Sequence, residues 1–131
     1  MKRLRTFTIT NGVIAFDADF VGNPAQAPDA ADVFDVPLGS TGVEVVGLLT
    51  NTAGAPVGAV GTYDLEVVEI LRRDGVDRYA RAEALTTQAM GDWTQILSTG
   101  KKRAGRKVAL RVHAVASLPT NGTLEIWIRH A

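Results

Sequence analysis

The sequence predicts an all-β domain, an antiparallel β-sandwich with a jelly-roll-like arrangement of strands. Apolar and polar residues alternate with a period of two in many short runs, and turns rich in glycine and proline separate these runs. Strands do not alternate with long helical segments, which argues against a parallel sheet. The 131 residues, 46% of them hydrophobic, suffice for one domain with its own core, residues 1–131. A compact β-barrel is the alternative layout.

The chain is expected to open with a β-hairpin. Residues 6–10 alternate between apolar side chains and threonines, and residues 13–16 are again largely apolar. The Asn11-Gly12 pair between these two runs is typical of a type I′ turn. We therefore expect the two runs to pair.

The middle of the chain carries three further strand signals. Residues 33–38 indicate a short strand that Pro37 confines to an edge or an end of a sheet. The nearly continuous apolar run 43–50 suits the middle of a sheet. Residues 63–73 form the longest candidate, and the Val67-Val68 doublet shifts their alternation as a β-bulge would.

Residues 76–90 fit two patterns. Alternating alanines after the Asp74-Gly75 turn signal favour a strand, whereas apolar residues at helical spacing that end before Gly91 favour a helix. Because a turn precedes the segment and Thr86-Thr87 occur within it, a strand is the prediction. Residues 93–99 predict one more strand.

The two C-terminal runs, 106–115 and 123–129, show the clearest alternation in the chain. Between them, segment 117–122 contains Pro119 and an Asn-Gly pair, which favour a reversal of the chain. We expect an antiparallel hairpin with one face against the core. Its other face would present arginine, histidine, tryptophan and glutamate to solvent.

Segment 17–36 is expected to be an extended loop or arm, because loops of this length are uncommon in compact domains. Burying its few apolar side chains contributes ~1.5–3 kcal/mol each, whereas ordering the backbone costs ~1–2 kcal/mol per residue. We therefore expect a neighbouring subunit to order the arm, with Phe20 and Phe34 as partner-binding residues. The alternative is a loop held on its own domain by the same two side chains.

Charge is unevenly distributed along a chain that is neutral as a whole. No lysine or arginine lies between Thr6 and Leu71, whereas eleven of the fourteen follow from Arg72 onward. The sandwich either keeps complementary patches or cancels them by interleaving the two halves. A basic cluster suits an acidic protein surface, and it lacks the interleaved aromatic residues that stack on nucleic-acid bases. This cluster consists of Lys101, Lys102, Arg103, Arg106 and Lys107.

Neither a catalytic site nor a cofactor or metal site is expected, so the chain is not predicted to be an enzyme. It has no cysteine and no nucleophile or phosphate-binding motif. His113 and His130 lie on strand faces that also carry arginine, and nearby cations disfavour a basic imidazole. The aspartates between residues 17 and 35 do not match the spacing of an EF-hand loop.

The chain resembles the small accessory virion proteins of tailed bacteriophages, especially head decoration or cement proteins. The features that carry the resemblance are the absence of cysteine and of an apolar leader, the short basic segment 1–5, the Ala/Pro/Asp arm and the divided charge. The resemblance implies a virion protein made in the host cytoplasm. It implies docking on the major capsid protein or another virion protein as a dimer or trimer, with no membrane partner and no expected nucleic-acid partner.

The alternative from another functional class is a carbohydrate-binding or receptor-binding module. In that case Trp93 and Trp127 would be the residues that stack on sugar rings. Trp127 is also a candidate for contact with a protein partner.

Overall fold

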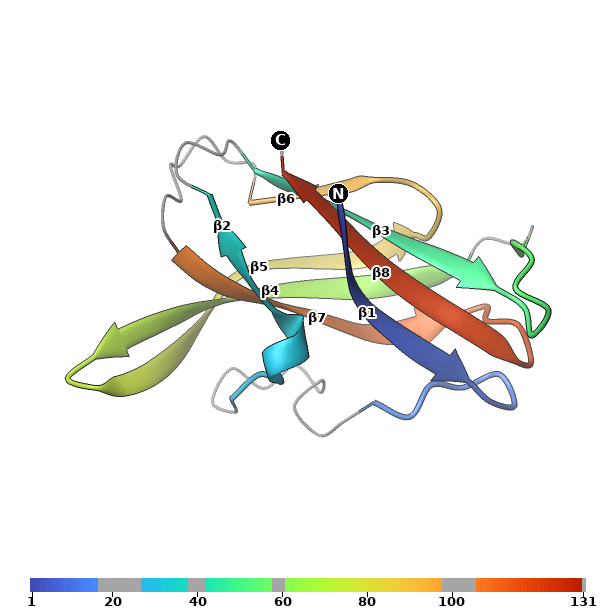
Figure 1. Cartoon of the computed structure of the whole chain (residues 1–131), viewed down its shortest axis with the longest axis horizontal. Coiled ribbons are helices and arrows are strands. Elements are labelled where there is room, and N and C mark those ends of the chain that lie inside the picture. The colour runs from blue at the N-terminus through green and yellow to red at the C-terminus, as the bar shows by residue number, and fades with distance from the viewer. Residues whose placement is uncertain (17–26, 38–41, 58–60, 98–105, 131) are drawn as a thin grey trace.

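The computed structural model describes residues 1–16, 27–37, 42–57, 61–97 and 106–130, which form eight strands and one 3₁₀ turn. The elements in chain order are β1 (Lys2–Ile9), η2 (Ala30–Asp32), β2 (Val33–Val36), β3 (Val43–Thr50), β4 (Thr62–Arg73), β5 (Val76–Ala89), β6 (Thr94–Ile96), β7 (Arg106–Ala116) and β8 (Gly122–His130). The strands make two antiparallel four-stranded sheets that face one another (Figure 1). They do not join into one closed sheet, so the predicted β-sandwich is confirmed.

The order of the strands is that of a jelly roll. The first sheet has the order β1-β8-β3-β6 and the second has β2-β7-β4-β5. The chain is thus one long folded hairpin that pairs β1 with β8, β2 with β7, β3 with β6 and β4 with β5. Successive pairs fall in alternate sheets, which is the double Greek-key arrangement of this class.

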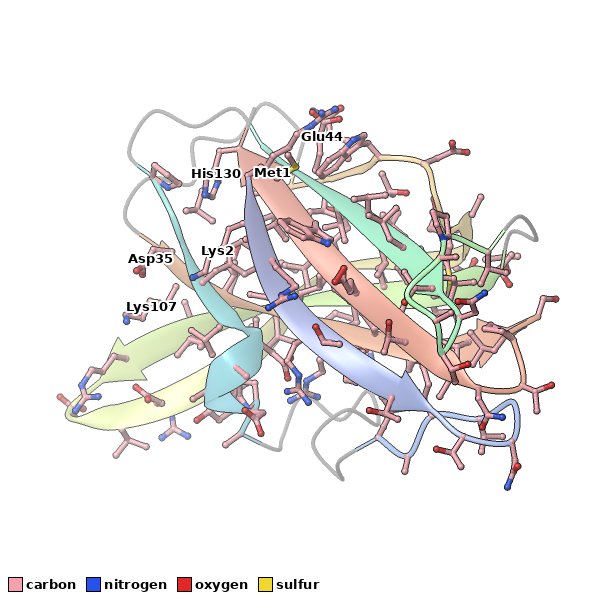
Figure 2. All side chains as sticks on the ribbon, turned by 45° about the vertical axis from the view of Figure 1, so that its right-hand side comes forward. Met1, Lys2, Asp35, Glu44, Lys107 and His130 are labelled. Atoms are coloured by element: carbon pink, nitrogen blue, oxygen red, sulfur yellow. The ribbon has the colours of Figure 1, made fainter. Side chains whose placement is uncertain are left out.

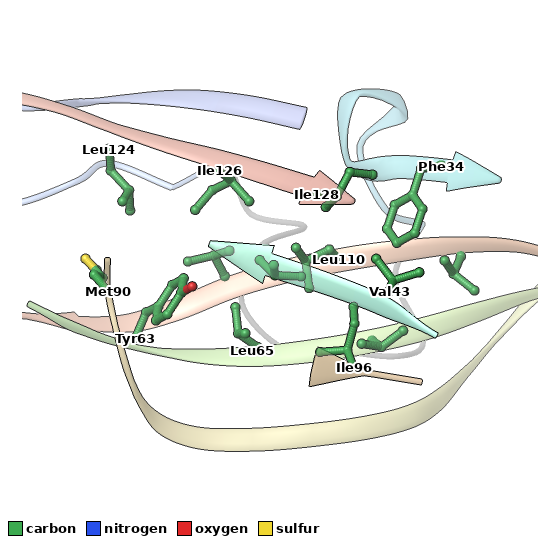
Figure 3. Packing of buried hydrophobic residues seen from close by; sticks show 14 of the residues in the cluster. Phe34, Val43, Tyr63, Leu65, Met90, Ile96, Leu110, Leu124, Ile126 and Ile128 are labelled. Carbon is green, nitrogen blue, oxygen red and sulfur yellow. The ribbon is translucent and has the colours of Figure 1, made fainter. Parts of the chain in front are cut away.

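The core lies between the two sheets. Leu124, Ile126 and Ile128 of β8 point inward from the first sheet, and Tyr63 and Leu65 of β4 point inward from the second (Figure 3). All five side chains are buried. Burial of an aliphatic side chain of this size contributes ~1.5–3 kcal/mol. The period-two pattern of these strands therefore supplies the contacts that hold the two layers together.

β7 and β8 are not the hairpin that the sequence predicts. β8 pairs with β1 and β3, while β7 pairs with β2 and β4 in the other sheet. The connection between them crosses from one sheet to the other, and Ser117 within it adopts a positive φ of 60°. Alternation predicts which face of a strand is buried, but it does not tell whether two strands share a sheet.

The predicted N-terminal hairpin is also wrong in its second strand. Asn11 and Gly12 have the positive φ angles of a type I′ turn, 52° and 76°. Only one bridge, between Thr10 and Val13, follows from that turn. Beyond Val13 the chain leaves the sheet, and Ile14 and Phe16 pack against the core as partly buried side chains.

The predictions for β4 and β5 are confirmed. The segment 76–90 forms a strand, and it pairs with β4 around the turn at Asp74 and Gly75, whose φ angles are 56° and 76°. The register between the two strands shifts between Val67 and Val68, as the valine doublet predicts. The shorter strand β2 is an edge strand followed by Pro37, again as predicted.

Part of the predicted arm belongs to the domain. Residues 17–26 lie outside the described part of the chain, but η2 and β2 cover residues 30–36. Asp32 is buried and accepts a hydrogen bond of 3.1 Å from the Arg5 guanidinium on β1. This contact fastens η2 to the first sheet while β2 pairs with the second.

Ion pairs join the acidic first half of the chain to its basic second half. Glu66 lies 3.0 Å from Arg81, and Glu44 lies 3.2 Å from Arg129. Interleaving of the strands therefore cancels part of the charge segregation that the sequence shows, as one of the two alternatives predicts.

Tyr63 lies fully buried against β3, beside Gly47. Burial raises the pKa of the Tyr63 phenol from 10.0 to about 12, and the Gly47 backbone opposes this shift in part. Even so, the hydroxyl has no hydrogen-bond partner of good geometry among the residues that the structure describes. A Cβ added at Gly47 would lie 3.0 Å from Tyr63 Cε2, so the absence of a side chain there makes room for the ring.

The buried phenol predicts a loss of stability at high pH. The folded protein holds the phenol proton up to a higher pH than the unfolded chain does. The contribution of the neutral Tyr63 to the free energy of unfolding is therefore complete below pH 10.0 and is lost between pH 10.0 and about pH 12. The expected loss reaches about 2 kcal/mol at the upper end of this range. Urea unfolding of the wild type and of Tyr63→Phe at neutral pH and at about pH 11 measures it. Equal alkaline losses in both proteins would contradict this assignment.

Candidate functional site

The hairpin of β4 and β5 extends beyond the rest of the second sheet (Figure 1). β5 pairs with β4 along its whole length to the turn, but pairing of β7 with β4 stops at Glu69 opposite Val108. Residues 70–79 therefore continue as a two-stranded ribbon, and no third strand of the described residues pairs with it on either side. We call this segment the ribbon.

The register of the ribbon divides its side chains between two faces. Leu71 is opposite Arg78 and Arg73 is opposite Val76, so these four residues share one face. We call it the apolar face because Leu71 and Val76 are 47% and 52% exposed, although both are large hydrophobic residues. The other face carries Ile70, Arg72, Asp77 and Tyr79.

A ribbon of two strands is at best marginally stable when it stands alone in water. Here it is continuous with the sheet at one end only. The ion pairs at its far end, Arg72 with Asp77 at 3.3 Å and Arg73 with Asp74 at 3.8 Å, are exposed. Exposed pairs of this kind contribute ~0–1 kcal/mol. A protein contact that covers Leu71 and Val76 would supply the burial that the ribbon lacks.

A groove of about 840 Å³ opens between the ribbon and the segment of η2 and β2. Its apolar lining comes from both sides and consists of Pro28, Ala30, Val33, Ile70, Leu71 and Tyr79. Charged residues complete the lining: Arg72 and Asp77 from the ribbon, and Lys107 from β7. Figure 2 shows Lys107 near Asp35, and the ammonium lies 3.9 Å from the carboxylate. We call this hollow the ribbon groove.

The predicted partner-binding residues do not form one surface among the described residues. Phe34 is buried in the core, so its predicted role in partner contact is wrong. Lys107 is exposed at the ribbon groove. Arg106 is the first residue of β7, and the structure describes only its backbone. Phe20, Lys101, Lys102 and Arg103 lie outside the described residues.

Trp127 and Trp93 each contact a charged side chain of β8. Trp127 donates a hydrogen bond of 3.4 Å from Nε1 to Glu125 Oε2. The Arg129 guanidinium lies 3.9 Å from the centre of the Trp93 ring, a cation–π contact, and it donates two hydrogen bonds of 3.2 Å to Glu44. The arginine covers one face of Trp93, which leaves Trp127 as the better stacking surface.

The aspartates weighed as calcium ligands have local partners where the structure describes them. Asp29 accepts a hydrogen bond of 2.8 Å from the Ala31 amide at the start of η2, and Asp32 pairs with Arg5. Asp35 lies beside Lys107. Asp17 and Asp19 lie outside the described residues. The described residues contain no group of three or more side chains that could hold a metal ion.

Sequence reasoning missed the apolar face and the ribbon groove. Their signal was the unusual length of the 63–73 run before an Asp-Gly turn, because a hairpin longer than its neighbours must extend past them. The run of β7 that pairs with β4 ends too early to reach the ribbon. The point where this pairing stops depends on the register between strands that are far apart in the sequence. The sequence of one strand alone does not reveal it.

In the described part of the chain, no helix has the length and apolar character needed to cross a membrane. No protein family, curated protein or solved structure matches this chain.

Proposed function

We propose that this chain is a structural virion protein that docks on a phage capsid as an oligomer and stabilises it. The observation that carries the proposal is the ribbon, which presents two large apolar side chains to solvent at 47% and 52% exposure. Exposed apolar surface on a projecting element is typical of a protein-binding site.

The free edges of both sheets are poorly suited to pairing with another chain. β6 has three residues, and β2 has four before Pro37. β1 and β5 are interrupted by register shifts, at Arg3/Arg5 and opposite Val67/Val68. Short, bulged or proline-ended edges are ordinary defences against edge-to-edge association. The ribbon is therefore the better candidate for specific contact.

The topology supports the proposal by analogy only. Jelly rolls with two four-stranded sheets occur in viral capsid proteins and in lectins, and a fold alone does not determine a function.

The proposal predicts that the purified chain sediments with capsids assembled from the major capsid protein encoded near its gene. Leu71→Ser combined with Val76→Ser should abolish this binding, because both apolar anchors are lost. Val13→Ser is the matched control, since Val13 is 63% exposed but lies in the turn after β1. If the wild type stays in the supernatant with every capsid preparation, the proposal is wrong.

A second candidate function, binding of carbohydrate, is favoured by the half-buried Trp127 ring on the outer side of the first sheet. A planar aromatic ring flanked by Glu125 and Arg129 offers both stacking and hydrogen bonds to a sugar. Signals on a glycan array that disappear in Trp127→Ala would support this function. A blank array together with capsid binding would leave the structural role.

A further inference from the structure

We infer that the outer side of the first sheet binds a neutral 2-acetamido sugar, with the sugar ring on Trp127 and the acetyl methyl group in a pocket beside Leu48. The inference goes beyond docking through the ribbon, because a different face of the molecule carries it. It deepens the second candidate function and rests on it, since it names the class of sugar.

The Trp127 ring supplies the stacking surface. Alternation along β8 places it on the outer side of the sheet, because the residues before and after it point into the core. Among the described residues, no guanidinium and no other aromatic ring lies against the Trp127 ring, whereas Arg129 covers Trp93. The hydrogen bond from Nε1 to Glu125 orients the ring. An aromatic ring held in this way can stack on the apolar C–H face of a sugar.

A pocket of about 210 Å³ lies beside this ring, and we call it the Leu48 pocket. In the register of β3 and β8, Trp127 is opposite Val46, and the next outward pair is Leu48 opposite Glu125. The two pairs are ~7 Å apart along the strands, a length that a sugar ring and its acetamido group span together. Leu48 is 40% exposed, so apolar surface is accessible here. The apolar lining consists of Leu48, Leu49, Pro56, Val57 and Met90.

Glu125 connects the ring to the pocket, because it lines the pocket and accepts the hydrogen bond from Trp127. A carboxylate has about four positions at which it accepts hydrogen bonds. Arg3 donates to Oε1 at 3.4 Å and Trp127 donates to Oε2 at 3.4 Å. The carboxylate therefore keeps capacity for the amide N–H of an acetamido group. A 6-deoxy sugar has a methyl group but no such N–H, so the acetamido sugar matches both features.

The charge of this face favours a neutral ligand. The charged side chains that β1, β3 and β8 place beside Trp127 form two ion pairs. Arg3 lies 3.4 Å from Glu125, and Arg129 lies 3.2 Å from Glu44. Each cation is thus balanced by a carboxylate, and the face has no excess charge that would attract an acidic sugar.

A glycan array tests the inference with sugars that differ only at the acetamido position. It carries N-acetylglucosamine and N-acetylgalactosamine beside glucose and galactose. The wild type should bind an acetamido sugar at least about tenfold more tightly than the parent sugar. Leu48→Ser should remove most of this preference, because the pocket loses an apolar wall. Val13→Ser, which replaces an exposed apolar residue elsewhere, should preserve it.

Two tryptophan variants test the position of the sugar ring. Trp127→Ala should abolish binding of every sugar on the array, because the stacking surface is lost. Trp93→Phe should bind like the wild type, since Arg129 already covers that ring. Circular dichroism of each variant verifies the fold, which surface substitutions leave intact.

The outcomes separate this inference from the functions proposed above. Equal binding of acetamido and parent sugars would overturn the inference and keep a carbohydrate-binding role. A preference for acetamido sugars that survives Leu48→Ser would also overturn it. A blank array would overturn both the inference and the second candidate function, whereas binding to capsids would be unaffected. Leu71→Ser combined with Val76→Ser should bind acetamido sugars like the wild type, because the ribbon belongs to the other sheet.

Discussion

Replacing Glu66 with alanine is expected to destabilise the protein by ~3–5 kcal/mol, because it breaks a buried ion pair and removes the buried carboxylate that faces Arg111. Glu66 is 2% exposed on β4, and its partner Arg111 on β7 is fully buried. Arg111 Nη1 lies 3.9 Å from Glu66 Oε1, and Arg81 Nη2 lies 3.0 Å from Oε2. The carboxylate therefore faces two guanidinium groups, one of them shielded from water.

Urea unfolding followed by tryptophan fluorescence measures this effect. Asp77→Ala is the matched control, because it breaks a 3.3 Å pair with Arg72 that is exposed to solvent. The control should cost no more than ~1 kcal/mol. Replacing Glu66 and Arg111 together with methionine should restore much of the loss, since neither charge is then buried alone. Equal losses for Glu66→Ala and Asp77→Ala would contradict the role assigned to the buried pair.

Gly122→Ala is expected to cost about 3–5 kcal/mol or to prevent folding, because two penalties add. Gly122 begins β8 with a φ of 153°, a conformation that favours glycine. A Cβ at this position would overlap the Thr50 carbonyl oxygen and lie 3.0 Å from its carbonyl carbon. The residue sits where β8 runs between β1 and β3, paired with Ile9, so neither neighbour yields easily.

Gly54→Ala separates the two penalties. Gly54 also has a positive φ, 79°, but a Cβ there would meet nothing within 4 Å. Its replacement should cost only ~1 kcal/mol, the price of backbone conformation alone. The yield of folded protein and the urea midpoint are the measurements. A Gly122→Ala variant as stable as Gly54→Ala would show that the contact with Thr50 is not a constraint.

Much of the fold follows from local pattern. The alternation along β8, the valine doublet in β4 and the Asp74-Gly75 turn each report a local backbone state, and the structure confirms all three. The assignment of each strand to one of the two sheets does not follow from local pattern, because β7 and β8 would show the same alternation whether they shared a sheet or faced each other. The Ser117 turn that carries the chain across the core has no distinctive sequence.

The burial of a charged side chain is the second feature that local pattern does not predict. Arg111 lies at one of the alternating polar positions of β7, which were expected to face solvent, yet it is fully buried beside Glu66. The register that sets these two residues opposite each other joins strands more than forty positions apart. The exposure of Leu71 and Val76 has the same origin, since it depends on where β7 stops. Distant register thus accounts for the buried ion pair and for the apolar face of the ribbon.

Hydrogen exchange of the ribbon, compared between a dilute monomer and capsid-bound protein, tests docking through the ribbon most directly. Amides of residues 70–79 should exchange rapidly in the monomer, where β4 pairs only with β5 along the ribbon, and slowly on the capsid. Amides in the turn at Asn11 and Gly12 should exchange at the same rate in both states. Unchanged exchange across the ribbon, with protection elsewhere on the bound protein, would contradict the claim that this chain docks through its ribbon.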